Sequence, residues 1–321
     1  MSKQIVVTPF GIYSSEGGKL SLESEFSTSP AEAAKTLRNY EKTETLPELD
    51  VLLESGAEFS ADSEASIDAR LRLDELAKER GIDSDKYIHA LNQELTKLRM
   101  HEELASPDRR IIQAVNSLEE MDPLVNVLSE RLREWSSLYS PELSRSVQKH
   151  NDFLIKLSQQ KEISSELGAV FERSDTEVPK GIAHSLSDMY ETRTRLREYL
   201  EKMMREHYPN LEAVAGSHIG AQLMALVGGA KRLATKPSST VQVLGAEKAL
   251  FRHVTTGAKP PKYGVLLHHP VINDLPKHLR GKGARILAGK ISLAIRADVY
   301  GSGFSADKLN EGLDKRIKNL K

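Results

Sequence analysis

A near-heptad spacing of apolar residues in the middle of the chain sets the strongest limit on its fold. Eight apolar residues follow one another at gaps of three or four positions: Ile111, Val115, Leu118, Met121, Val125, Leu128, Leu132 and Trp135. A stripe of this period predicts a long helix that packs along a second helix. Because Pro123 lies inside the stripe, we expect a kink there, or a restart of the helix with Asp122 as its cap.

A second stripe with gaps of three and four follows about fifty residues later: Leu186, Met189, Arg193, Leu196, Leu200, Met203 and His207. Its polar members, Arg193 and His207, indicate a less buried edge. The segment 173–181 contains Pro179 and is interpreted as the loop between the long helices, and a third helix is expected over about 143–160. Two antiparallel stripes predict a hairpin-like coiled coil. Its outer face either stays free or pairs with a second copy.

The regions before and after the stripes have different residue patterns, so the chain is expected to have three parts. Together they predict a mainly α-helical chain. Residues 1–105 are expected to form a small α/β domain, with strands over 3–7 and 11–13 and helices over 30–40 and 67–80. Residues 106–214 are the expected coiled coil, and residues 215–321 an all-α domain. The helices expected there cover 219–226, 231–234, 247–254 and 284–299, with a capping box at Ser239–Gln242 and glycine caps at Gly257 and Gly301.

Charge divides the chain into two opposed parts. The whole chain carries 45 Lys and Arg against 46 Asp and Glu, but from Gly216 onward the counts are 18 against 6, and before it 27 against 40. A confined basic block with few acids is suited to a phosphate backbone. The acidic remainder would be repelled by nucleic acid and is free to bind protein partners.

Several classes of function find no support in the residues. The chain has no cysteine, which excludes disulfides, thiolate metal sites and cysteine nucleophiles. The segment 226–232 lacks the spacing of a phosphate-binding loop, and no Gly-x-Ser-x-Gly motif occurs. His268 and His269 precede Pro270 and are interpreted as capping or packing groups rather than metal ligands. No signal-type region and no apolar run of about 20 residues is present, so we expect a protein of the cell interior without a membrane segment.

The basic block contains candidate contacts to nucleic acid. On a helix, Lys282, Arg285 and Arg296 fall on one face, within about 60° of one another at 100° per residue. The segment Lys259-Pro-Pro-Lys262-Tyr263-Gly places two lysines and an aromatic ring on a stiff loop, where Tyr263 could stack on an unpaired base or pack inside the protein. A merely solvated face explains any one of these residues, but less well a region with three times as many bases as acids.

Three motifs carry a family resemblance. Gly245-Ala-Glu-Lys-Ala-Leu-Phe251, Gly257-Ala-Lys-Pro-Pro-Lys-Tyr-Gly264 and Arg280-Gly-Lys-Gly-Ala-Arg285 closely resemble the Nop domain, and Arg131-Leu-Arg-Glu-Trp135 resembles the coiled coil of the same family. The resemblance is strong over about 108–300 and weak over the first hundred residues. It is closest to the archaeal core protein of box C/D RNA-guided methylation particles; the spliceosomal member of the family is the alternative.

This resemblance implies a scaffold without catalytic residues, metal or cofactor of its own. The N-terminal domain would dock fibrillarin, the 2′-O-methyltransferase that binds S-adenosylmethionine. The coiled coil would pair two copies, and the Nop domain would bind box C/D guide RNA together with the ribosomal-type protein on its kink-turn. An archaeal chain of this kind is expected in the cytoplasm.

Carried over by position, the resemblance also assigns residues. The RNA contacts are expected at Lys248, Arg252, Lys259, Lys262, Tyr263, His268, Lys282 and Arg285. Glu247 is assigned to the protein partner on the RNA, and the fibrillarin-docking surface is placed around Phe10, Ile12 and Tyr13.

Overall fold

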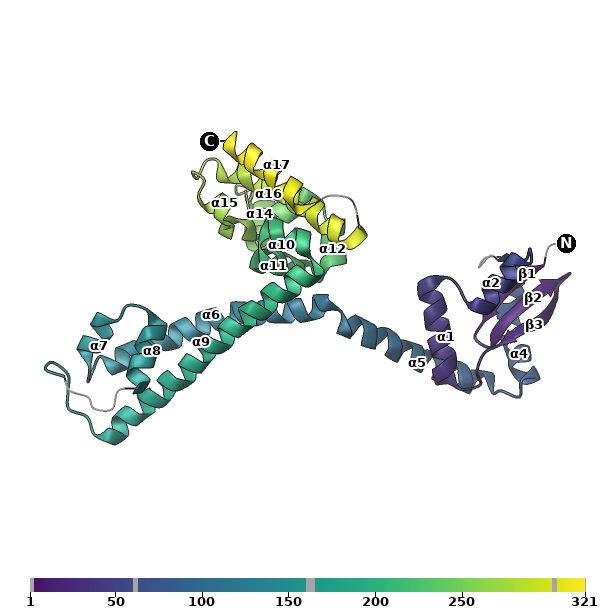
Figure 1. Cartoon of the computed structure of the whole chain (residues 1–321), viewed down its shortest axis with the longest axis horizontal. Coiled ribbons are helices and arrows are strands. Elements are labelled where there is room, and N and C mark those ends of the chain that lie inside the picture. The colour runs from purple at the N-terminus through teal and green to yellow at the C-terminus, as the bar shows by residue number, and fades with distance from the viewer. Residues whose placement is uncertain (1–2, 60–62, 160–164, 302–304, 321) are drawn as a thin grey trace. The chain divides into compact units, whose positions relative to one another are not determined.

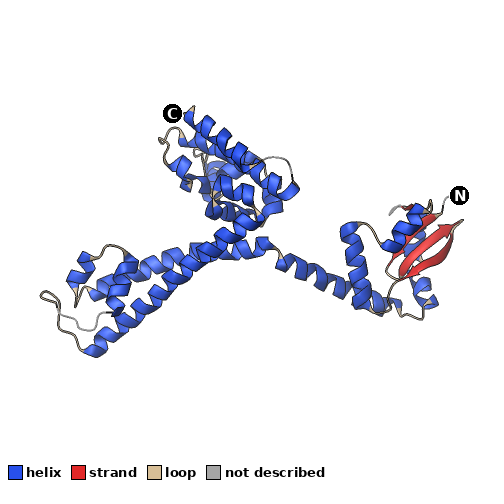
Figure 2. Cartoon of the chain, viewed as in Figure 1, coloured by secondary structure: helices blue, strands red, loops and turns tan. Residues whose placement is uncertain are grey.

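The computed structural model describes residues 3–59, 63–159, 165–301 and 305–320. It confirms a mainly α-helical chain with one small sheet near the N-terminus (Figures 1 and 2). The chain divides into two compact units, with the boundary between Ser106 and Pro107. These are called the N-terminal unit and the C-terminal unit below.

The N-terminal unit contains a four-stranded sheet in the order β3-β2-β1-β4. Its strands are β1 (Gln4–Thr8), β2 (Gly11–Glu16), β3 (Lys19–Glu25) and β4 (Glu58–Phe59). The first three form an antiparallel meander, and β4 runs parallel to β1. The turn between β2 and β3 is Gly17-Gly18, where both residues have positive φ, as a two-residue hairpin of type I′ requires. The strands over 3–7 and 11–13 were predicted; β3 and β4 were not.

Five helices complete the N-terminal unit: α1 (Pro30–Thr43), α2 (Pro47–Glu54), α3 (Glu64–Leu71), α4 (Leu73–Glu79) and α5 (Ser84–Ala105). The helix predicted over 67–80 is in fact two helices, because the chain leaves helical geometry at Arg72. Helix α1 packs along α5, and Glu102 of α5 pairs with Arg38 (2.6 Å) and Lys42 (2.7 Å) of α1. Hydrogen bonds from Arg38 and then Lys42 lower the pKa of Glu102 to about 2.

The C-terminal unit is helical throughout its described residues. Its first four helices are α6 (Pro107–Ser136), α7 (Pro141–Ser146), α8 (His150–Gln159) and α9 (Arg173–His207). The remaining elements are α10 (Pro209–Ala215), α11 (Ser217–Val227), α12 (Ala230–Thr235), α13 (Ser238–Val243), α14 (Glu247–Thr256), η1 (Val265–His268), α15 (Pro270–Asn273), α16 (Arg280–Tyr300) and α17 (Ala306–Lys318).

Helices α6 and α9 form the predicted long hairpin, and α8 packs against α9 (Figure 1). Two sequence predictions within it are wrong. The segment 173–181 is the first part of α9 rather than a loop, because Thr176, Pro179 and Ala183 lie at helical spacing and are buried. The expected third helix is split into α7 and α8, which are separated at Val147.

The apolar stripe of α6 drifts around the helix, as a 3.5-residue repeat on a 3.6-residue helix must, by about 20° per heptad. Ile111, Leu118 and Leu132 are buried on the face toward the rest of the unit. Leu128 and Trp135, predicted in the same seam, have turned outward and are 44% and 39% exposed. Together with Leu124 and Val127 they form an apolar outer stripe on α6, defined by these four residues.

Pro123 does not interrupt α6, so the predicted alternative of a restart with Asp122 as cap is wrong, and the predicted kink stays a prediction. Asp122 caps no helix. It forms an ion pair with Arg193 and lies 3.9 Å from Arg197, both on α9. The half-buried ion pair and the apolar contacts along the hairpin help α6 to continue through a position where proline removes one backbone hydrogen bond. Arg193 is thus the partner of a carboxylate rather than a sign of an exposed edge.

Two hydrophobic cores stabilise the C-terminal unit. One lies near the far end of the hairpin and contains Tyr139, Phe153 and Leu186. The other joins the first half of α6 and the last part of α9 to the helices that follow, from Ile111 to Ile317. The base of the hairpin shares this core with the later helices, and the C-terminal unit is not divided at residue 214. The boundary between the coiled coil and the all-α domain, expected between residues 214 and 215, stays a prediction.

The short helices predicted after residue 215 are confirmed, as are the caps at Gly257 and Gly301, which both adopt left-handed geometry. The capping box at Ser239–Gln242 is wrong. Helix α13 already begins at Ser238, so its cap position is Pro237, and Gln242 falls in the last turn.

Asp108, in the first turn of α6, joins three elements of the C-terminal unit. One carboxylate oxygen accepts a hydrogen bond from the Tyr208 hydroxyl at the end of α9, and the other accepts from the Ala230 N–H at the start of α12 (2.8 Å). Burial and Asp108 raise the pKa of Tyr208 above its usual range. At Gly229 an added Cβ would lie 2.7 Å from the same carboxylate. The chain therefore passes Asp108 closely at a residue without a side chain.

We expect Asp108→Ala to lower the free energy of unfolding of the C-terminal unit by about 2 kcal/mol, because hydrogen bonds to a charged group are lost and two donors lose their partner. Urea unfolding followed by the fluorescence of Trp135, the only tryptophan of the chain, measures this. Asp188→Ala, which removes an exposed carboxylate of α9, is the control and should change it by less than about 0.5 kcal/mol. Equal effects would contradict a structural role of Asp108.

Candidate nucleic-acid interface

The basic residues predicted to bind RNA lie on three neighbouring segments of the C-terminal unit. These are α14, the proline loop (defined as residues 257–264) and the first turns of α16. All six Lys and Arg candidates are exposed: Lys248, Arg252, Lys259, Lys262, Lys282 and Arg285. None of them takes part in an ion pair with another described residue. Together they are called the basic surface, whose positive charge is not neutralised by the described part of the protein.

The proline loop is held by its neighbours directly after Tyr263. The Gly264 N–H donates to the Gln242 carbonyl (3.0 Å), and the Val265 N–H donates to the Leu244 carbonyl (2.9 Å). Gly264 is required here, because an added Cβ would lie 1.7 Å from the Leu244 carbonyl oxygen. The loop therefore has a defined conformation although it carries exposed lysines.

The loop also lies against the start of α16. A Cβ added at Gly281 would be 3.3 Å from the Cβ of Lys262, which places Lys262 beside the turn that carries Lys282. Arg285 follows Lys282 by three residues and lies on the same side of α16. The structure thus brings Lys262 of the loop beside Lys282 and Arg285, which the sequence placed on a separate segment.

Gln242 makes the link between these segments, and the sequence interpretation missed it. Its side-chain Nε2 donates to the Lys262 carbonyl (2.7 Å) and lies 3.4 Å from the Gly281 carbonyl. No local pattern points to such a role, because both partners are remote in sequence.

Helix α14 buries none of its residues and has two different faces. Leu250, Phe251 and Val254 are 40%, 70% and 76% exposed and share one side of the helix. Lys248 and Arg252, four residues apart, share another side, roughly 130° away at 100° per residue. Exposed apolar side chains that gather on one side of a helix are typical of a surface that a partner covers.

The remaining predicted contacts in this region have mixed surroundings. Glu247 is exposed and accepts a hydrogen bond from the Gly245 N–H (2.8 Å), so it closes the turn before α14 instead of pairing with Lys248 or Arg252. Tyr263 is half-buried, and His268 is exposed. His253 contacts the Ala258 carbonyl and holds the start of the proline loop against α14.

His269 is a capping residue, as the sequence predicted. Its Nδ1 accepts from the Val271 N–H (3.3 Å) at the start of α15, and its ring also bonds the backbone of Val214. Burial lowers the pKa of His269 below its usual range. The neutral ring thus ties η1 and α15 to α10.

Arg296 is exposed, as a member of the predicted cationic face would be, and its Nε also donates to the Ala234 carbonyl in the last turn of α12 (3.0 Å). The structure does not support one assignment made from the sequence. Phe10, Ile12 and Tyr13 are 0%, 0% and 3% exposed in the core of the N-terminal unit. Short apolar strands on a small sheet serve its own core here, so these side chains cannot form a docking surface in this conformation.

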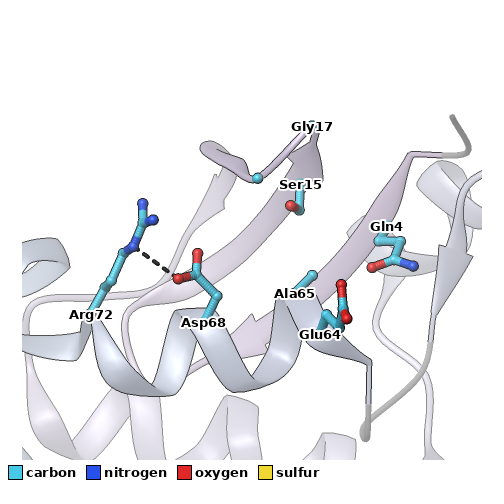
Figure 3. Close-up of a pocket in the computed structure, with 8 residues that line it drawn as sticks. Gln4, Ser15, Gly17, Glu64, Ala65, Asp68 and Arg72 are labelled. Atoms are coloured by element: carbon cyan, nitrogen blue, oxygen red, sulfur yellow. Dashed lines mark ion pairs between the residues drawn. The ribbon is translucent and has the colours of Figure 1, made fainter.

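The N-terminal unit has an open polar cleft of about 530 Å³ (Figure 3). Gln4 and Ser15 reach it from the sheet, whereas Glu64 and Asp68 reach it from α3. Asp68 forms an ion pair with Arg72 (3.0 Å) along one side.

Two absences hold for the described residues alone. Residues 3–59, 63–159, 165–301 and 305–320 contain no group of three or more His, Asp or Glu side chains placed to hold a metal ion. Within the same ranges, none of the helices combines the length and the apolar character that crossing a membrane requires.

The chain is similar in sequence to known proteins of one family. The family model described as Nop, "snoRNA binding domain, fibrillarin", matches residues 117–319. A NOP5 family protein of Methanocaldococcus jannaschii is 39% identical over 260 residues, which cover 74% of this chain and 63% of that protein. Nucleolar protein 58 of Homo sapiens is 34% identical over 253 residues, covering 71% of this chain and 47% of its own length.

The chain therefore belongs to the Nop family, as its motifs indicated. The alignments span about half to two thirds of the length of these relatives. A solved structure of a fibrillarin/Nop5p complex is also similar, with a TM-score of 0.46 and 23% identity over 99% of this chain and 100% of that chain.

His269 makes the stability of the C-terminal unit sensitive to pH. Since its pKa is lowered on folding, the stabilisation is complete above pH 6.5, the ordinary value, and is lost as the pH falls through the lowered pKa. We expect the difference in unfolding free energy between the wild type and His269→Gln to be larger at pH 7.5 than at pH 5.5. Urea unfolding at both pH values measures it, and a constant difference would contradict the assignment.

Proposed function

We propose that this chain is a non-catalytic scaffold of a box C/D guide-RNA 2′-O-methylation particle. It links fibrillarin to kink-turn RNA and to the ribosomal-type protein bound there. The observation that carries the proposal is the composition of α14, which presents exposed apolar residues on one side and unpaired cations on another.

A surface of this kind suits a composite target better than RNA alone. The lysines and arginines of the basic surface complement phosphates, which account for most of the affinity and little of the specificity in RNA binding. Phe251 and Val254 offer apolar contact area, which a protein bound to the RNA would cover. Recognition of both at once selects RNA that already carries its protein.

The chemistry of methylation belongs, in this proposal, to the partner. Fibrillarin supplies the active site and the bound S-adenosylmethionine, and this chain supplies distance and orientation. The helix α9 has 35 residues, and a helix rises about 1.5 Å per residue, so a rigid element of this length sets a fixed reach.

The N-terminal unit is the proposed docking site of fibrillarin, through residues other than those inferred from the sequence. In place of the buried Phe10, Ile12 and Tyr13, the exposed apolar side chains are available. Ile67 and Leu71 lie one turn apart on α3 and are 52% and 81% exposed, and Val51 on α2 is 65% exposed. Such side chains mark a protein-binding surface more than a solvent-facing one.

The outer stripe of α6 supports the proposed pairing of two copies through the hairpin. Leu124, Val127, Leu128 and Trp135 lie within about 100° on the helix, since each residue advances by 100°. All four are at least 39% exposed although the inner face of the same helix is buried. An apolar stripe on a long helix is buried in a coiled coil when a second hairpin packs against it.

A gel shift on kink-turn RNA tests the scaffold proposal. We expect the wild type to supershift the RNA only when its ribosomal-type protein is present. Phe251→Glu should remove the supershift, because a carboxylate replaces the apolar contact. Arg252→Ala should weaken binding and lower the dependence of log K on log salt by about 0.7–0.9, the loss of one phosphate contact.

Lys308→Ala on α17 is the matched control for charge and should leave the supershift and the salt slope unchanged; Lys308 is exposed but lies outside the basic surface. Equal binding of the wild type to bare RNA of any shape would contradict recognition of a composite surface. Methylation of guided RNA by the purified chain with S-adenosylmethionine alone would contradict a scaffold without its own active site.

The proposed pairing makes a separate prediction. We expect a dimer at micromolar concentration without RNA, and a monomer for Leu128→Glu, because the charge would be buried between two hairpins. Asn126→Glu adds the same charge on another side of α6, at an exposed position, and should stay dimeric. Light scattering after size-exclusion chromatography gives the mass, and a monomeric wild type would leave the outer stripe without this role.

A further inference from the structure

The side chain of Gln242 connects two parts of the basic surface that are far apart in sequence. Its amide lies between the backbone carbonyls of Lys262 and Gly281, at 2.7 and 3.4 Å. A carbonyl can only accept hydrogen bonds, so both neighbours require the NH₂ group of the amide at this place. One side chain thereby bonds the proline loop and faces the first turn of α16.

The same residue also holds the loop through its backbone. The Gln242 carbonyl accepts from the Gly264 N–H (3.0 Å), two residues beyond the carbonyl that its side chain bonds. Lys262 and Gly264 are therefore anchored on either side of Tyr263 by one residue. Their anchor belongs to α13, which packs on α16 and contains the fully buried Val241.

We propose that Gln242 is a positioning residue for RNA binding: it sets the placement of Lys262 relative to Lys282, so that both meet neighbouring phosphates. The proposal rests on the proposed RNA-binding function. It assigns to Gln242 no contact with RNA. The amide acts on the backbone under Lys262, and the lysine makes the contact.

Lysine needs such support because its long side chain loses rotamer freedom when it binds. A mobile backbone at Lys262 would add to this entropic cost. It would also change the distance between the ammonium groups of Lys262 and Lys282. Since neither Lys262 nor Lys282 has an ion-pair partner among the described residues, the internal structure does not direct them. The positions of the two ammonium groups therefore depend on where the backbones of Lys262 and Lys282 lie.

A double-mutant cycle on kink-turn RNA with its ribosomal-type protein tests the inference. We expect Gln242→Met, which keeps the volume and removes the donor, to weaken binding about tenfold, equivalent to about 1.4 kcal/mol. In a Lys262→Ala background the same change should weaken binding less than twofold, because the residue it positions is gone. In an Arg252→Ala background the tenfold loss should remain, since the side-chain hydrogen bonds of Gln242 go to Lys262 and Gly281 and not to α14.

Two further measurements keep the result interpretable. The salt slope should fall by about 0.7–0.9 in Gln242→Met and fall no further in the double variant with Lys262→Ala. Ser239→Ala, an exposed change on the same helix, should leave binding unchanged, and circular dichroism should show the same helix content and melting temperature for Gln242→Met and the wild type.

The outcomes separate the two proposals. A wild type that does not bind the RNA–protein probe would overturn the proposed function itself. A wild type that binds, with a Gln242→Met loss equal in the Lys262→Ala and Arg252→Ala backgrounds, would show a general structural effect and overturn the positioning role. Where Gln242→Met melts early, Gln242→Glu provides the second test: its carboxylate would repel the two carbonyls and must show the same coupling to Lys262.

Discussion

The arrangement of the C-terminal unit depends on the packing of α6 against α9 and on the carboxylate at its base. Asp108 accepts from Tyr208, where α9 ends, and from Ala230, where α12 begins. The hydrogen bonds therefore close the hairpin and orient the helices that follow it. The orphan N–H groups at the start of α12 meet an aspartate rather than a ligand, which is favourable for a helix N-terminus. The glycine pair at 228–229, which on sequence alone invited comparison with a phosphate-binding loop, lets the chain pass this carboxylate closely.

A shared core extends this constraint to the basic surface. Buried residues of α6 and α9, such as Val115 and Leu200, belong to the same cluster as Leu287 and Ile291 of α16. The hairpin base and the helix that carries Lys282 are consequently parts of one packed body. Close-packed protein interiors have low compressibility and transmit a displacement from one element to the next. A partner that binds α14 and the proline loop would for this reason be held at a defined distance from the outer stripe of α6, which the proposed scaffold function requires.

Much of this fold could be predicted from the sequence, and the failures share a cause. The hairpin and the short C-terminal helices carry strong periodicity or glycine caps, so local patterns sufficed. Pro123 and Pro179 lie inside helices because tertiary contacts, the Asp122–Arg193 pair and the packing of α8 on α9, outweigh the lost backbone hydrogen bond. The outward drift of Leu128 follows from helix geometry, but which side of the stripe is covered depends on α9. Burial of Phe10 likewise depends on α1 and α5, which lie far along the chain.

The candidate site also contains residues that the sequence reveals and residues whose role depends on tertiary contacts. Residue type and local charge were enough to select Lys262 and Lys282, since exposed cations need no structural partner. Gln242 could not be found in this way, because its role is defined by carbonyls 20 and 39 residues away and not by any property of its neighbours. Its position in an apparent capping box even suggested a different use. In the proposed function, contacts to a phosphate backbone would come from side chains whose chemistry is visible in the sequence. The geometry of those contacts would depend on uncharged residues such as Gln242, whose side chain bonds the backbone carbonyl of Lys262.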